Sequence, residues 1–251
     1  YWSRLAREYG HDVKIISPKK VKGFLQGQKT DANDALAIAI AATQVGMVFS
    51  PVKEVEQQSM QTLDTSRKFL DRQQLALSNH IRAYLYEYGI TVGMGYKKLS
   101  GAVISILDEA DARLPQCLKR TLQVLWDQYQ YTLTQLSEAE KAKAALVKQI
   151  EPCKRLMELE GVGCVGASML YASLGDGSQF KNGRDASVYV GVTPKQHSSG
   201  GKTHMIGINK NGGNKELRAV LYMGALSLIK SLSEKPKTVK EAWLLNLVKR
   251  A

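Results

Sequence analysis

The feature that most constrains the fold of this chain is a seven-residue repeat of apolar side chains. Between residues 54 and 88 the repeat falls at Leu63, Leu70, Leu77 and Tyr84, with Phe69 and Ile81 alongside. A second long apolar segment covers residues 118–150. This spacing places the repeating residues on one side of a helix. The two segments therefore predict two long helices, paired either as an antiparallel hairpin or coiled coil, or within a helical bundle of one domain. Either arrangement is a scaffold, and an exposed leucine seam favours a dimer.

The charge of the chain is concentrated in its last third. The formal net charge is +12 over 251 residues, and residues 181–251 carry +9 of it. A basic segment of this size indicates a polyanionic partner. No apolar run is long enough to span a bilayer, and no segment has the pattern of a membrane-surface helix, so nucleic acid is the favoured partner. The three scattered cysteines show no metal-ligand spacing and fit a reducing cytoplasm, without a secretory signal.

Residues 1–50 have the pattern of the end of an α/β domain. A helix is predicted for residues 1–9, a buried strand for Val13–Ile16, a short helix after Pro18 and an alanine-rich helix to about Thr43. Asp31 and Asp34 lie one turn apart at the start of the last helix, where paired carboxylates can contribute to a Mg²⁺ site. Capping of that helix by Thr30 or Asp31 explains the same residues more simply.

Residues 153–251 are predicted to form a small helical domain that follows the arm of residues 51–152. In this domain Gly161-Val162-Gly163 precedes a helix rich in small residues, as in the turn of a helix-hairpin-helix motif. Glycine amides in such a turn bind a DNA phosphate, so Gly161 and Gly163 are candidate nucleic-acid contacts. A plain glycine turn between packed helices is the alternative interpretation.

The most distinctive motif of the domain is Ser198-Ser199-Gly200-Gly201-Lys202, in a segment predicted to be a loop from Pro194 to Lys202. Glycines let a backbone approach a phosphate closely, and a serine hydroxyl is a possible nucleophile. His197 precedes the serines and is interpreted as a solvated loop residue. The polar residues that follow the serines are candidate phosphate contacts: Lys202, Lys210, Asn214, Lys215 and Arg218.

Taken together, these residues resemble the DEDD insertion-sequence transposases, a family of RuvC-like serine recombinases that includes pilin-gene invertases and bridge-RNA-guided recombinases. Three collinear blocks carry the resemblance. The first is Lys29-Thr30-Asp31-Ala32-Asn33-Asp34-Ala35. The second is Leu159-Glu160-Gly161-Val162-Gly163 with Leu174-Gly175-Asp176 and Phe180. The third runs from Gly191-Val192 and Pro194 through Ser198–Lys202 to Ile208, Lys210, Gly212, Asn214, Leu217 and Arg218.

The resemblance implies a mainly helical protein in three parts. Residues 1–50 would be the C-terminal part of an RNase H-like (RuvC-like) domain, residues 51–152 a helical coiled-coil arm, and residues 153–251 the transposase domain. Asp31 and Asp34 would be two of four acids that hold Mg²⁺. Ser199, with Ser198 as the second choice, would attack a DNA phosphate and form a phosphoserine link. Donor and target DNA, a guide (bridge) RNA and a homodimer or homotetramer are the partners that the resemblance implies.

The chain departs from the family pattern at its start. The first Asp and the Glu of the acidic set should precede Tyr1, so we expect this chain to bind nucleic acid but not to recombine DNA alone. Two other functions remain open from the residues. One is a non-catalytic helix-hairpin-helix protein, in which Ser199 has no special role. The other is a Mg²⁺-dependent junction nuclease with water as the nucleophile, which would require Asp34 but not Ser199.

Overall fold

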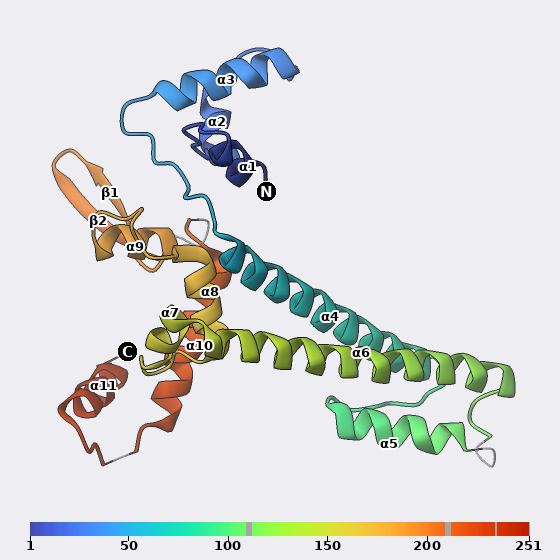
Figure 1. Cartoon of the computed structure of the whole chain (residues 1–251). Coiled ribbons are helices and arrows are strands. Elements are labelled where there is room, and N and C mark those ends of the chain that lie inside the picture. Colours follow the sequence, from blue (N-terminus) through green and yellow to red (C-terminus); the bar gives the residue numbers. More distant parts are fainter. Residues whose placement is uncertain (109–111, 209–211, 234, 251) are drawn as a thin grey trace. The chain divides into compact units, whose positions relative to one another are not determined.

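A computed structural model describes residues 1–108, 112–208, 212–233 and 235–250. The described residues are mainly helical, as predicted, and include one two-stranded antiparallel sheet (Figure 1). They divide into two compact units, each described by itself below. The first contains residues 1–58, 160–166 and 170–251, and the second contains residues 59–159 and 167–169. None of the described helices is both long and apolar enough to cross a lipid bilayer.

The second unit is built on two long helices, as the heptad pattern predicted. Helix α4 (Val55–Tyr86) and helix α6 (Gln116–Gln149) run antiparallel, with α5 (Tyr96–Leu107) beside them (Figure 1). Contacts along the pair fix this direction, because Asp64 meets Lys143, Gln74 meets Tyr129 and Tyr84 meets Leu118. We call α4, α5 and α6 the helical arm.

The core of the helical arm lies where α5 packs against the long helices. Its nine buried side chains are Ile81, Leu85, Leu99, Val103, Ile106, Leu114, Leu122, Trp126 and Tyr129. The predicted seam residues Leu63, Leu70, Leu77 and Tyr84 are only half-buried, and Phe69 is exposed. The heptad therefore marks the edge of the helix interface, and Ile81 and Leu85 of α4 lie in its buried core.

An ion network occupies the other part of the α4–α6 interface. The ammonium of Lys143, which is only 2% exposed, lies 2.7 Å from one carboxylate oxygen of Asp64. The ammonium of Lys68 lies 2.6 Å from the other oxygen. Burial by itself would raise the pKa of Asp64, but the hydrogen bonds and charges of Lys143 and Lys68 outweigh it and hold that pKa below its ordinary value. Because the pairing requires Asp64 to lie opposite Lys143, we expect the network to favour one register of the helix pair.

Residues 1–50 of the first unit contain α1 (Trp2–Glu8), α2 (Pro18–Val21), the 3₁₀ helix η1 (Lys22–Phe24) and α3 (Asp31–Thr43). The strand predicted for Val13–Ile16 is wrong. Ile15 makes one isolated bridge with Ser50, whose N–H donates to the Ile15 carbonyl at 2.8 Å. A β-branched run forms a strand only when a partner strand pairs along it, and Ser50 supplies one residue of such a partner.

The C-terminal part begins where α7 (Glu151–Met157) follows α6, with Pro152 in its first turn. Helices α8 (Cys164–Leu174) and α9 (Gly183–Val190) come next. Strands β1 (Pro194–Ser199) and β2 (Lys202–Ile208) follow, and α10 (Lys215–Ser231) and α11 (Val239–Arg250) end the chain. Gly191, in the left-handed conformation, ends α9.

Candidate functional site

The two serines lie on a β-hairpin, so the loop predicted for Pro194–Lys202 is wrong. Strand β1 ends at Ser199, which pairs with Lys202, the first residue of β2. Gly200 and Gly201 connect the strands with φ values of +57° and +77°. Positive φ at both central residues defines the type I′ turn, which fits the twist of a two-residue hairpin. The turn glycines therefore serve the hairpin, and they leave Ser199 exposed at its tip.

The three candidate lysines differ in where they lie relative to the hairpin. Lys202 is exposed and stands directly opposite Ser199. Lys215 is exposed at the first position of α10. Lys210 lies outside the described residues. Lys202 is therefore the candidate cation that the fold places beside the candidate nucleophile.

Arg218 and Asn214 make internal contacts at the base of the hairpin. The guanidinium of Arg218 donates to the Gly191 carbonyl at 3.1 Å and to the Gly212 carbonyl at 2.9 Å. Gly191 precedes β1 and Gly212 follows β2, so one side chain connects the two ends of the hairpin segment. The side chain of Asn214 caps α10 by accepting a hydrogen bond from the N–H of Leu217 at 3.1 Å. Both residues hold the hairpin base in place.

The same base depends on two glycines whose backbones nearly touch. A Cβ atom on Gly213 would overlap the backbone of Gly191, and one on Gly191 would lie 2.9 Å from the Gly212 carbonyl oxygen. Both residues also have positive φ, which disfavours a side chain. The sequence alone did not reveal this contact, because the two glycines are 22 residues apart and either could mark an ordinary turn.

Gly161 and Gly163 lie in the turn between α7 and α8, as the helix-hairpin-helix interpretation required. Gly161 has φ of +80°, and a Cβ on it would lie 3.0 Å from the carbonyl oxygen of Gly224 in α10. Close backbone packing thus accounts for Gly161. Gly163 is the exposed N-cap residue of α8. Phosphate binding by the backbone of either glycine stays a prediction.

Asp31 and Asp34 begin α3, and Thr30 caps this helix by accepting a hydrogen bond from the N–H of Asn33 at 3.3 Å. Because Thr30 is the cap, capping does not require the carboxylate of Asp31. Asp31 is exposed, whereas Asp34 is half-buried at an apolar cavity that Lys14 and Lys22 also line. Two carboxylates can contribute to a Mg²⁺ shell that water and phosphate complete. Within the described ranges, no three His, Cys, Asp or Glu residues gather closely enough to hold a metal.

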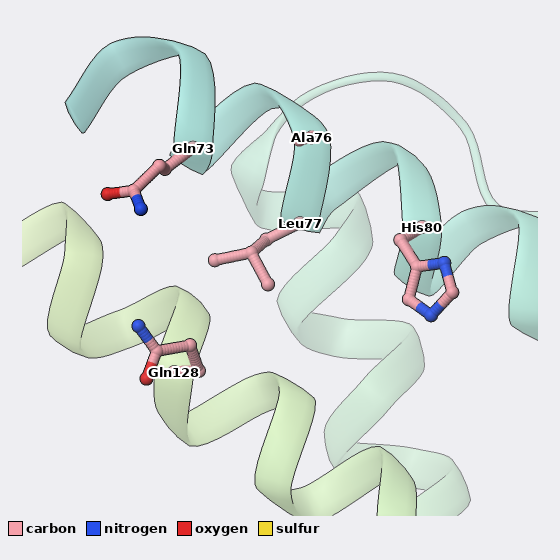
Figure 2. Close-up of a pocket in the computed structure, with 5 residues that line it drawn as sticks. All are labelled: Gln73, Ala76, Leu77, His80 and Gln128. Carbon is pink, nitrogen blue, oxygen red and sulfur yellow. The ribbon is translucent and has the colours of Figure 1, made fainter. Parts of the chain in front are cut away.

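A groove on the helical arm is a weaker candidate. Figure 2 shows Gln73, Leu77 and His80 of α4 on one side and Gln128 of α6 on the other, with both glutamine side chains extending into the gap. Ala76 completes the lining. These five side chains include one imidazole but no lysine or arginine, so the groove lacks a permanent positive charge for a phosphate.

Comparisons with known proteins place the hairpin within a recognised family. The pattern of the transposase IS116/IS110/IS902 family matches residues 153–240, which include the hairpin and its base. The chain is 37% identical over 250 residues to the transposase for insertion sequence element IS1111A of Coxiella burnetii, covering 100% of this chain and 68% of that protein. It is 34% identical over 251 residues to a probable family 20 transposase of Pseudomonas aeruginosa, covering 100% of this chain and 74% of that protein.

A more distant match is the pilin gene-inverting protein of Moraxella bovis, 22% identical over 266 residues, covering 96% of this chain and 71% of that protein. The family match and the similarity to the Coxiella burnetii and Pseudomonas aeruginosa proteins define the class of the chain as a transposase. It belongs to the IS116/IS110/IS902 family.

Proposed function

We propose that this transposase cleaves and rejoins DNA strands through Ser199, which becomes joined to the cut strand as a phosphoserine. The observation that supports it is the position of Ser199, exposed at the tip of a hairpin beside a turn without side chains. An exposed hydroxyl at such a tip can approach the backbone of a duplex without steric hindrance. Lys202, directly opposite, supplies positive charge for the phosphate.

The chemistry that we propose conserves the phosphoester bond. The Oγ atom of Ser199 attacks phosphorus and gives its proton to a base. The bond from phosphorus to the leaving deoxyribose oxygen breaks, and that oxygen takes up a proton. Because the protein–DNA link remains a phosphodiester, a deoxyribose hydroxyl can later displace Ser199 and rejoin a strand without an external energy source.

Asp31 and Asp34 are the residues that we propose as Mg²⁺ ligands. They occupy successive turns of one helix face, and the half-buried position of Asp34 limits the solvent around its carboxylate. A Mg²⁺ ion held there would supply positive charge to the phosphate oxygens. The remaining ligands would come from water, the phosphate and carboxylates other than Asp31 and Asp34.

The partners that we propose are donor and target DNA, a structured guide RNA and further copies of this chain in a dimer or tetramer. The charge of +9 in residues 181–251 supports a nucleic-acid partner. The exposed aromatic side chains of Phe69 and Tyr131 on the helical arm are candidates for contacts between copies.

The test expresses the protein from its natural gene, together with the transcripts of that locus, and supplies labelled DNA of the insertion-sequence ends. Covalent protein–DNA product is measured on a denaturing gel, and binding is measured separately. We expect Ser199→Ala to abolish the covalent product and to retain binding. Ser198→Ala, the matched control, should retain both.

Each alternative function gives a different result in this experiment. Cleavage that survives Ser199→Ala but not Asp34→Ala would replace the serine mechanism with a metal-dependent nuclease. Binding without cleavage in the unmodified protein and in all three variants would indicate a non-catalytic nucleic-acid-binding protein.

A further inference from the structure

The two faces of the β1–β2 hairpin differ sharply in composition. Cross-strand partners point to the same side of a sheet, and successive residues alternate sides. The register pairs Ser199 with Lys202, His197 with His204 and Lys195 with Ile206, which form one face. It pairs Ser198 with Thr203 and Gln196 with Met205, which form the opposite face. We call these the Ser199 face and the Ser198 face.

The Ser199 face collects the groups that bind phosphate. It carries two lysines and two histidines in addition to the serine, whereas the Ser198 face carries no ionisable side chain. Every residue of both strands is exposed, so the whole Ser199 face is accessible to a ligand. The chain contains four histidines, and the hairpin register places two of them opposite each other.

The spacing of these groups suits a single phosphate. Directly paired residues in an antiparallel sheet have Cβ atoms about 5 Å apart, and diagonal neighbours lie about 7–8 Å apart, within reach of long side chains. Lys202 is the direct partner of Ser199, and His204 is a diagonal neighbour. A phosphate at the Ser199 hydroxyl is therefore within reach of both the Lys202 ammonium and an imidazole N–H.

We propose that His197 and His204 donate hydrogen bonds to the DNA phosphate that Ser199 faces, with Lys202 providing its counter-charge. This inference rests on the proposed function, and it assigns the nucleophile to Ser199 because Ser198 points away from these donors. The histidines are positioning residues for the phosphate. His204 is separated from the serines by the turn in the sequence, so only the strand register reveals its place.

The first test observes the imidazole groups directly by two-dimensional ¹H–¹⁵N NMR of the 251-residue Ser199→Ala chain. The added probe is a 20-base-pair duplex DNA. We expect the ring signals of His197 and His204 to shift on binding. Signals of His11, near the N-terminus, and His80, on the helical arm, are internal controls and should not move. Binding of DNA with the rings of His197 and His204 unmoved would overturn the proposal.

The second test compares the two faces by mutation. Phenylalanine keeps an aromatic ring and a high strand propensity but removes the N–H donors. We expect the double variant His197→Phe/His204→Phe to bind the duplex about tenfold more weakly, which corresponds to two hydrogen bonds of about 0.7 kcal/mol each. Lys202→Gln should flatten the dependence of log K on log salt concentration by about one unit.

The matched control removes polar groups from the Ser198 face with Gln196→Leu/Thr203→Val, and it should change binding less than twofold. An equal or greater loss in this control than in the histidine variant would refute the assignment of faces. Because these measurements require binding and not cleavage, they can fail while Ser199 still forms a covalent product. They can also succeed when Ser199 forms none, so the two proposals are judged separately.

Discussion

The helical arm buries nine apolar side chains in one core, whereas every residue of the β1–β2 hairpin is exposed. In the arm, side-chain packing across α4, α5 and α6 fixes the structure. An isolated two-stranded hairpin is marginally stable, so its conformation depends on the glycine turn at one end and on Arg218 at the other. Substitutions in the arm should therefore change the free energy of unfolding, and substitutions in the hairpin should mainly change DNA binding and cleavage.

The largest effect is expected for Asp64→Ala in the arm. The substitution leaves the ammonium of Lys143 buried without its carboxylate, so we expect a loss of about 3 kcal/mol in the free energy of unfolding. Urea unfolding followed by helical circular dichroism measures it. Glu138→Ala is the control, because its ion pair with Lys141 is exposed and should contribute less than about 0.5 kcal/mol. Equal losses in the two variants would show that the buried network adds no more stability than an exposed ion pair.

The same network predicts a dependence on pH. The pKa of Asp64 is lower in the folded chain than in the unfolded chain, so its stabilisation is present above the unfolded value of about 3.9 and is lost as the pH falls through the folded value. Unfolding of the parent chain and of Asp64→Asn, measured between pH 6 and pH 2, should converge toward the acid end. A constant difference over this range would contradict the lowered pKa.

Gly224→Ala tests the contact between α10 and the turn that contains Gly161. Alanine normally stabilises a helix interior by about 1 kcal/mol relative to glycine. Here its Cβ would overlap the Gly161 carbonyl, so we expect a net loss of about 2 kcal/mol in the same unfolding assay. Gly101→Ala in α5 is the matched control, since open space surrounds its Cβ position and stabilisation is expected.

Arg218→Gln separates a structural role from a phosphate contact. If the side chain mainly holds the hairpin base, the free energy of unfolding should fall by about 1.5 kcal/mol, with an unchanged salt dependence of DNA binding. Lys215→Gln removes the same charge from an exposed position of the same helix, and it serves as the control for the unfolding measurement. A salt slope lower by about one unit for Arg218→Gln, without loss of stability, would instead support the predicted phosphate contact.

The smallest effect on unfolding is expected at the hairpin turn. Gly200→Ala places a side chain at φ of +57° and should cost the hairpin about 1 kcal/mol, while the helical signal hardly changes. Gly200→Asn should be tolerated better, since asparagine is common in type I′ turns. Cross-strand NMR contacts between Ser198 and Thr203 report the hairpin directly. Equal loss of these contacts in both variants would argue against the turn type.

Local patterns in the sequence predicted much of the fold. The heptad of leucines indicated the long helices, and the candidate cap residues Thr30 and Asp31 marked the start of α3. These signals are readable because helix periodicity and capping involve residues within a few positions of one another. The candidate serines were also identifiable from their glycine-lysine surroundings, and so were the acids that follow Thr30.

The tertiary structure decided which of these residues meet. Asp64 and Lys143 are 79 positions apart, and their pairing follows from the register of two helices rather than from any local motif. The segment predicted as a loop, Pro194–Lys202, forms a hairpin because β1 pairs with β2. The segment predicted as a strand, Val13–Ile16, forms a single bridge because it has no partner strand among the described residues. Residue spacing determines the face of a helix or strand on which a side chain lies, but only packing determines what that face contacts.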